Sequence, residues 1–180
     1  VVASKNSAIS INKKILPFND KVLQIQLQKS KLTASTSYKG IQKTDVILIC
    51  VPTPVNNKNL PDLSILKEVS KKLSKNICKN QIIILESTVH PGVSEEVVIP
   101  ILEKGSKLKC GRDFYYAYCP ERINPGDKKW SVQNIPRVLG AHDSTSLNKA
   151  YDFYNNVLNT TIHKVKNLKE AEAVKVVENA

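Results

Sequence analysis

The chain has 180 residues, of which 41% are hydrophobic and 24% charged, and its formal net charge is +11. This composition is typical of a soluble globular domain, and the apolar runs are far too short to cross a bilayer, so we expect no membrane partner. The charge comes mostly from scattered lysines without interleaved aromatic residues, which indicates a solvated surface and no nucleic-acid partner, although affinity for a phosphorylated ligand stays open.

Short apolar runs alternate with helical patterns from residue 45 onward. We expect buried strands at 45–51, 81–87, 114–119, 137–141 and 161–165. We expect helices at 63–73, 93–102, 145–158 and 168–180, the second of them ended or kinked at Pro100. Before residue 45 we expect a helix over 19–29 and a short strand near 32–35, whereas residues 1–15 show no pattern.

This alternation predicts an α/β fold, with a doubly wound parallel sheet and helices on both faces. Ligands bind such sheets at the carboxyl ends of the strands. The polar residues that follow each strand are therefore the candidates for a functional site.

The first two strands each end in hydroxyl groups. Thr53 lies between Pro52 and Pro54, which stop the strand, so the loop either presents a hydroxyl to a ligand or is only a rigid turn. Ser87 and Thr88 close the second strand just before a helix, where two hydroxyls either bind an anion or water, or cap the helix.

The third strand and the last helix carry charged candidates. Glu121 and Arg122 follow the 114–119 run; Glu121 is either a general base or one member of a surface ion pair. Lys175 and Asn179 are four residues apart on one helical face, which either holds an oxyanion or is simply solvated.

Four cysteines, at positions 50, 78, 110 and 119, form no CxxC pair and no cluster with histidine. The sequence therefore indicates neither a zinc site nor a redox motif, and it suits the reducing cytoplasm. The start of the chain has no signal-peptide pattern, and the absence of methionine suggests a processed chain or a fragment.

Four segments, "DVILICVPTP", "ESTVHPG", "CPERINPGDKKW" and "EAEAVKVVEN", together resemble the UDP-glucose/GDP-mannose dehydrogenase family in their order and approximate spacing. The resemblance covers about residues 15–180. "PERINPGDK" is most similar to the branch that oxidises UDP-N-acetylglucosamine or UDP-N-acetylgalactosamine, to which Vi-antigen and O-antigen enzymes belong.

The resemblance implies an NAD-dependent enzyme, without a metal, that oxidises the C6 hydroxyl of a UDP-N-acetylhexosamine to a carboxylate for capsule or O-antigen polysaccharide synthesis. Two NAD+ are consumed, and a cysteine holds the intermediate as a thiohemiacetal and then as a thioester, which water cleaves. The resemblance also implies a homodimer in the intact enzyme.

Site residues follow from the same resemblance. The cofactor-binding positions are Val51, Pro52, Thr53, Pro54, Val55, Ser87, Thr88 and Val89. The catalytic positions are Glu121 as acid or base, Thr88 beside the catalytic water, and Lys175 with Asn179 at the oxyanion. The substrate-binding positions are Glu121, Arg122, Ile123, Asn124, Lys175 and Asn179.

The sequence also departs from the family pattern. Pro125 stands where the UDP-glucose branch has a second glutamate, which favours the N-acetylhexosamine branch. The G-x-G-x-x-G loop, the acid that binds the ribose and the segment with the nucleophilic cysteine are all missing, and Cys119 sits where the family has a small residue.

We therefore expect an internal piece of a larger enzyme. Residues 1–166 would be a partial NAD-binding domain that lacks its first strand, and residues 167–180 the start of the central interdomain helix. Alone, the piece should neither turn over nor bind NAD+ tightly, and its 45–51 strand should expose an apolar edge. The alternative is a non-catalytic or decayed module of the same fold that binds a nucleotide sugar.

Overall fold

The computed structural model describes residues 1–180 except 3, 17, 57–59, 124–130 and 179–180. The chain forms two compact units, Val1–Gly40 and Ile41–Ala180. We describe each unit by itself.

The first unit contains two helices, α1 (Lys5–Asn12) and α2 (Lys21–Lys29), which begin at the N-caps Ser4 and Asp20. The pattern predicted α2 but not α1. The strand expected near 32–35 is wrong: this segment is irregular. Its backbone bonds instead with the Asn12 side chain, which both donates to the Ala34 carbonyl and accepts from the Ala34 N–H.

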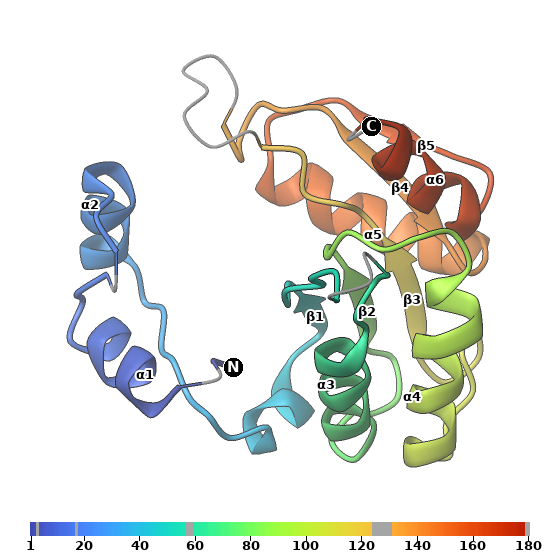
Figure 1. Ribbon diagram of the computed structural model, residues 1–180, viewed down its shortest axis with the longest axis horizontal. Helices are drawn as coiled ribbons and strands as arrows, with labels where there is room; N and C mark the ends of the chain where they lie inside the picture. Colours follow the sequence, from blue (N-terminus) through green and yellow to red (C-terminus); the bar gives the residue numbers. More distant parts are fainter. Residues whose placement is uncertain (3, 17, 57–59, 124–130, 179–180) are drawn as a thin grey trace. The chain divides into compact units, whose positions relative to one another are not determined.

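The second unit is built on a sheet whose five strands follow one another in chain order (Figure 1). The strands are β1 (Val46–Ile49), β2 (Ile82–Leu85), β3 (Tyr115–Tyr118), β4 (Arg137–Ala141) and β5 (Ile162–Lys164). All five expected strands are confirmed. Their β-branched and aromatic residues suit a sheet buried on both faces.

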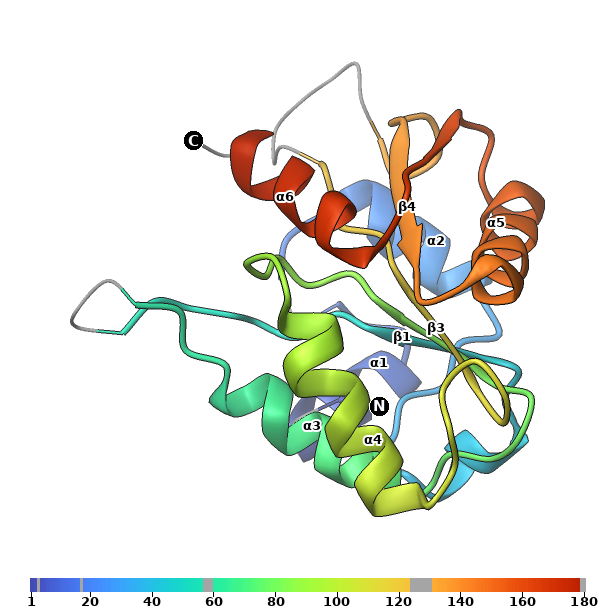
Figure 2. The ribbon, with the colours of Figure 1, turned by 90° about the vertical axis from the view of Figure 1, so that its right-hand side faces the viewer.

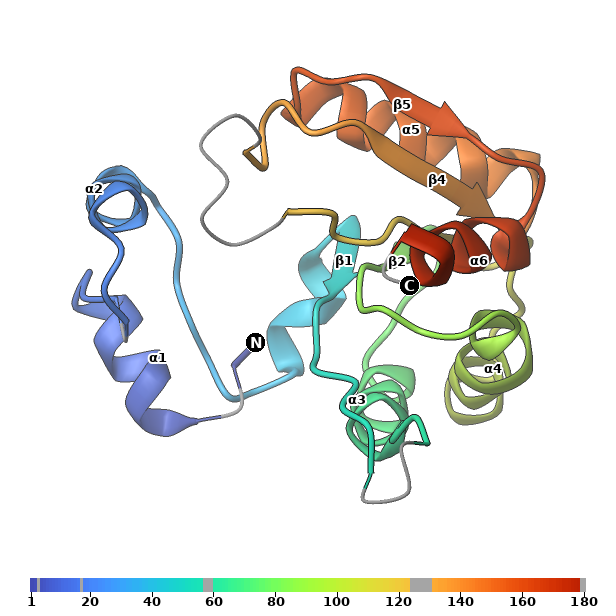
Figure 3. The same ribbon diagram turned by 45° about the horizontal axis from the view of Figure 1, so that its top comes forward.

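Most of the sheet is parallel, as predicted, but one pairing is not. β1, β2 and β3 run parallel, and so do β4 and β5 (Figure 3), whereas β4 runs antiparallel to β3. A parallel neighbour needs a crossover, usually a helix. The described residues between β3 and β4 contain no helix, and the chain returns beside β3 in the opposite direction.

Helices cover both faces of the sheet, which confirms the doubly wound α/β class (Figure 2). One face packs against α5 (Ser144–Val157) and the other against α6 (Leu168–Glu178). The α6 face also carries α3 (Ser64–Ser74) and α4 (Ile99–Ser106), and a short 3-10 helix, η1 (Lys39–Lys43), precedes β1. The helix predicted to stop or kink at Pro100 instead opens with a π-helical turn, η2 (Ser94–Val98), and continues to Ser106. A π-turn just before Pro100 accommodates a residue that has no N–H to donate.

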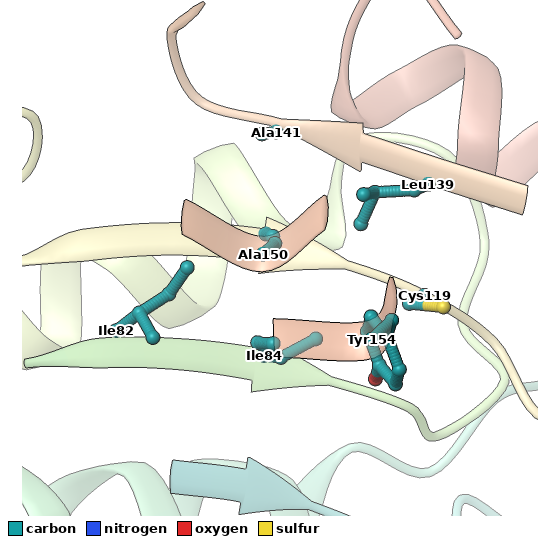
Figure 4. Packing of buried hydrophobic residues seen from close by; sticks show 8 residues of the cluster. Ile82, Ile84, Cys119, Leu139, Ala141, Ala150 and Tyr154 are labelled. Atoms are coloured by element: carbon teal, nitrogen blue, oxygen red, sulfur yellow. The ribbon is translucent and has the colours of Figure 1, made fainter. Parts of the chain in front are cut away.

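The core beneath α5 joins alternate residues of the central strands to one face of that helix (Figure 4). Its members are Ile82, Ile84, Ala117, Cys119, Leu139, Ala141, Ala150 and Tyr154. At the end of the described sheet, β1 leaves Leu48 43% exposed between the buried Ile47 and Ile49. Of the long apolar edge predicted for this strand, the described residues expose Leu48.

No helix in the described part of the chain is long and apolar enough to span a bilayer. The boundary predicted between residues 166 and 167 stays a prediction. In the second unit α6 packs directly on β4 and β3.

Candidate functional site

The loops after β1 and β2, which contain the predicted cofactor-binding residues, are joined by two side-chain hydrogen bonds. Ser87 Oγ donates to the Val51 carbonyl at 2.6 Å, and Thr53 Oγ1 donates to the Thr88 carbonyl at 2.6 Å. The parallel β1–β2 pairing places both loops at the carboxyl edge of the sheet. The hydroxyls therefore stiffen this edge, and their remaining lone pairs are acceptors only.

The chain beyond Thr53 leaves the sheet as a narrow hairpin. Asp62 N donates to the Pro54 carbonyl at 2.7 Å, and Asn56 N donates to the Leu60 carbonyl at 2.8 Å. Val55 and Pro61 form the bridge between the two arms, and Val55 is 63% exposed. The sequence indicated a stiff loop here but not its hairpin form. Pro52 is also exposed.

The helix that follows β2 is capped from a distant part of the chain. Glu172 of α6 is fully buried, and its two carboxylate oxygens accept from Gly92 N at 2.6 Å and from Ser94 N at 2.9 Å. Ser87 and Thr88 therefore do not cap this helix, which settles one alternative left open by the sequence. Because these amides already donate to Glu172, they are not available to bind an anion at this helix start.

Of the remaining cofactor candidates, Val89 is 4% exposed and belongs to the core, whereas Thr88 is half-buried. Of these two side chains, only that of Thr88 is partly open to solvent. The Thr88 carbonyl is already occupied by Thr53.

Glu121 lies just past β3 at the same edge. Its backbone N donates to the Glu86 carbonyl at 3.2 Å, which ties it to the end of β2. Its Oε1 accepts from the backbone N of Arg122 at 2.7 Å and of Ile123 at 2.8 Å. Its Oε2 lies 3.4 Å from Arg137 Nη2, and the side chain is 42% exposed. All these neighbours are donors, as a carboxylate requires, and the group still reaches solvent.

Arg122 is engaged on all sides in this structure. Its Nε lies 2.9 Å and 3.0 Å from the two Glu178 oxygens, and its Nη2 lies 2.5 Å from Glu178 Oε1. Its Nη1 donates to the Pro136 carbonyl at 2.9 Å. The hydrogen bond with Glu178 raises the pKa of Arg122 and lowers the pKa of Glu178. Arg122 thus fastens the end of α6 to the chain around β3 and β4.

Lys175 is brought to the same place by that contact. The residue is only 8% exposed, and its Nζ lies 3.8 Å from Glu178 Oε2. Within the described part of the chain its ammonium makes no hydrogen bond that meets normal geometry. The predicted residues Glu121, Arg122, Ile123 and Lys175 therefore gather at one edge. Asn124 and Asn179, like Pro125, lie outside the described residues.

Sequence reasoning missed a cluster beside this edge, which we call the Glu86 cluster: Cys50, Glu86, Cys119 and Tyr154. Glu86 Oε1 accepts from Tyr154 Oη at 2.5 Å, and Cys50 Sγ lies 3.5 Å from Glu86 Oε2. Cys119 lies beside the Tyr154 ring under α5 (Figure 4). The available signal was an acid that directly follows the apolar "QIIIL" run.

Burial dominates the acid–base properties of this cluster. It raises the thiol pKa of Cys119 to about 12, against the opposing effect of Arg137. Cys50 is exposed at its surface, but partial desolvation of its thiol, followed by the neighbouring Glu86, raises the pKa of Cys50 to about 12. Burial likewise raises the pKa of Tyr154, whose hydroxyl donates to Glu86. The cluster therefore holds its thiols and its phenol in the protonated form.

Among the described residues, no group of three or more His, Cys, Asp or Glu side chains is placed to hold a metal ion.

A mostly parallel, doubly wound sheet with polar groups gathered at its carboxyl edge defines the class of nucleotide-binding α/β domains. The chain belongs to the UDP-glucose/GDP-mannose dehydrogenase family, whose NAD-binding domain matches residues 3–158. The resemblance inferred from the four sequence segments is confirmed, and the cofactor of this domain is NAD.

Two relatives and one solved structure illustrate the similarity. Protein CapL of Staphylococcus aureus is 39% identical over 160 residues, which cover 89% of this chain and 38% of that protein. The UDP-N-acetyl-D-glucosamine 6-dehydrogenase of Pseudomonas aeruginosa is 38% identical over 84% of this chain and 36% of that protein. The structure of UDP-D-ManNAc dehydrogenase from Pyrococcus horikoshii superposes with a TM-score of 0.90 at 27% identity, over 97% of this chain and 42% of that chain.

The chain thus spans well under half the length of these relatives. The residues present fit the cofactor in part. The loops after β1 and β2 are hydrogen-bonded to each other at the carboxyl edge of the sheet, where such folds bind their ligands, but no G-x-G-x-x-G loop is in the sequence, and its first glycine is Gly40. The helix start after β2 does not replace that loop, because its Gly92 and Ser94 amides already donate to the Glu172 carboxylate.

Proposed function

We propose that these residues form the cofactor- and sugar-facing part of an NAD-dependent UDP-N-acetylhexosamine 6-dehydrogenase. Such an enzyme oxidises a primary alcohol twice: the C6 alcohol, two NAD+ and one water give the C6 carboxylate, two NADH and three protons. NAD accepts the hydrides. The relative from Pseudomonas aeruginosa supports this substrate class, as does Pro125, which stands where the UDP-glucose branch has a glutamate.

The observation that carries the proposal is an indirect link between Glu121 and Lys175: Arg122, the residue after Glu121, and Lys175 both approach the Glu178 carboxylate. Glu121 offers a carboxylate that is 42% exposed and anchored by two backbone amides. Lys175 offers a nearly buried ammonium that makes no hydrogen bond within the described residues. Cleavage of a thioester by water requires both of these groups, an acceptor for a proton and a donor for an oxyanion.

The remaining roles that we propose rest on the resemblance of the four sequence segments to the family. The segments 51–55 and 87–89 lie along the cofactor, and Thr88 contacts the catalytic water. Arg122, Ile123 and Asn124 contact the sugar nucleotide, and Asn179 assists Lys175. We further propose a homodimer in the intact enzyme and a role in capsule or O-antigen synthesis. A cytoplasmic location agrees with the four free cysteines.

The test uses a protein that contains these residues together with the segments its relatives have beyond them. NADH absorbance is followed with UDP-N-acetylglucosamine, UDP-N-acetylgalactosamine, UDP-glucose and GDP-mannose in turn. We expect two NADH per sugar and the highest kcat/KM with an N-acetylhexosamine. A folded protein that reduces NAD+ with none of the four substrates would leave only the alternative of a non-catalytic sugar-nucleotide module.

A further inference from the structure

Arg137, the first residue of β4, is a buried cation whose partners are incomplete. The side chain is 2% exposed. Neither Nε nor Nη1 has a hydrogen-bond partner among the described residues, and Nη2 lies 3.4 Å from Glu121 Oε2. Its guanidinium carbon also lies 5.8 Å from the centre of the Tyr154 ring. Removing a guanidinium from water is costly, so its burial at this point needs a reason.

The antiparallel pairing of β4 with β3 places Arg137 beside Glu121. The β3–β4 register pairs Ala117 with Ala141 and Tyr118 with Gly140. Continued in the same register, it brings position 137 opposite position 121. A parallel β4 would have put its first residue at the far edge of the sheet. The one reversed pairing is therefore what delivers a cation to the candidate site.

The two oxygens of Glu121 have different surroundings. Oε1 is held by the amides of the next two residues, at 2.7 Å and 2.8 Å. Oε2 faces Arg137 Nη2, the only side-chain donor within hydrogen-bond distance of it in the described part of the chain. Arg137 thus fixes the rotation of the carboxylate, and Oε2 is the oxygen left to take up a proton.

Glu121 is also the carboxylate that Arg137 pairs with. Glu86 is nearby in the sheet, but its oxygens are used by Tyr154 at 2.5 Å and by Cys50 at 3.5 Å. No ion pair within 4.0 Å joins Glu86 to Arg137 among the described residues, whereas Arg137–Glu121 is one. The Arg137 guanidinium therefore pairs with Glu121, at the carboxyl edge of the sheet, and not with Glu86.

We propose that Arg137 is a positioning residue that holds Glu121 Oε2 toward the water that cleaves the thioester; this rests on the function proposed above. In that step the water oxygen bonds to the thioester carbon and Glu121 takes one of its protons. The carbon–sulfur bond breaks, its electron pair leaves with the sulfur, and the proton taken up by Glu121 passes to that sulfur, which ends as a thiol. The second proton of the water is released to solvent as the product becomes a carboxylate. Arg137 touches neither the water nor the substrate.

The test is a double-mutant cycle in the extended protein described above, with Arg137→Met, Glu121→Gln and both together. We expect Arg137→Met to slow thioester hydrolysis by roughly tenfold or more, because a misplaced base loses part of the usual contribution of base catalysis. The first hydride transfer and the KM for NAD+ should stay unchanged. In the Glu121→Gln background, adding Arg137→Met should cost nothing further, as for two residues that act as a unit.

Two further variants separate positioning from structure. Arg137→Lys keeps the charge and the stem, so it should fold where Arg137→Met does not and should recover part of the hydrolysis rate. Arg112→Met is the matched control, because Arg112 also pairs with an acid, Asp113, but is 73% exposed and remote from the site. It should leave both steps unchanged.

The outcomes are distinguishable. If the unsubstituted protein reduces NAD+ but the Arg137 and Glu121 effects multiply, or both chemical steps slow equally, Arg137 has only a structural role and the inference is overturned. If the unsubstituted protein reduces no NAD+ with any nucleotide sugar, the proposed function fails and the inference fails with it. Selective loss of hydrolysis, with no added loss in the double variant, supports both.

Discussion

At the scale of single residues, Cys119 shows how burial decides reactivity. It precedes Glu121 by two residues, close to the candidate chemistry, yet it is fully buried and its pKa is raised to about 12. At neutral pH the thiol is therefore protonated, and the thiolate is the form that acts as a nucleophile. The sequence-based exclusion of Cys119 as the nucleophile thus gains a physical reason.

Cys50 offers a direct test of the Glu86 cluster. Glu86 contributes to the raised pKa of Cys50 both through its charge and through a hydrogen bond. Glu86→Gln removes the charge, so the thiol pKa should fall and alkylation of Cys50 by iodoacetamide at pH 8 should accelerate by about three- to tenfold. Peptide mass spectrometry over time measures the rate.

Cys110 in the same sample serves as the internal control. Its pKa is also raised to about 12, by burial and by Asp143 and Glu103, without a contribution from Glu86. Its alkylation rate should not change. Equal rates for Cys50 with and without the Glu86 charge would show that the carboxylate does not face the thiol.

At the scale of elements, the position of α6 depends on close contact with β4. A side chain at Gly140 would place its Cβ 2.4 Å from the Asn167 carbonyl oxygen and 2.8 Å from Ala171 Cβ. The first turn of α6 therefore lies directly against β4. This contact sets the positions of Glu172 and Lys175, which lie further along α6. This close contact explains why the buried strand β4 has a glycine at position 140.

Gly140→Ala should accordingly destabilise the fold by about 1–3 kcal/mol, as overpacking of a filled interior does. The chemical-denaturation midpoint of this chain measures it. Gly40→Ala is the matched control, because a Cβ there meets nothing within 4 Å. A Gly140→Ala chain as stable as the control would mean that α6 does not rest against β4 at this point.

The same elements show what the sequence could and could not predict. All five strands followed from local apolar runs, since β-branched residues such as Ile82–Leu85 suit a sheet buried on both faces. The reversed direction of β4 left no local signal, so Arg137 was overlooked. The Glu172 cap joins residues 78 and 80 positions apart in the chain. Glu178, which orders Arg122 and Lys175, lay within a quoted segment but followed no recognisable pattern.

At the scale of the whole molecule, the chain contains the loops at the carboxyl edge of the sheet but no glycine-rich loop to bind a pyrophosphate. Pyrophosphate groups of dinucleotides are normally held by a glycine-rich loop at a helix start. The sequence has no such loop, and the amides at the helix start after β2 are bonded to Glu172. The edge that remains offers contacts to only part of a dinucleotide.

Calorimetric titration of NAD+ into this 180-residue chain should therefore show no binding in the micromolar range. The extended protein should bind under the same conditions, which controls for the quality of the cofactor and buffer. A micromolar Kd for the 180-residue chain would contradict this prediction, because it would require a phosphate site other than a glycine-rich loop or the helix start after β2.

The central claim is that Glu121 acts at the ligand edge, and one measurement tests it most directly. Glu121→Gln in the extended protein, mixed with NAD+ and a UDP-N-acetylhexosamine, should slow hydrolysis by about 10²-fold or more, within the range typical of base catalysis. A covalent sugar adduct should then accumulate and be visible by intact-protein mass spectrometry. No adduct together with normal turnover would contradict the claim.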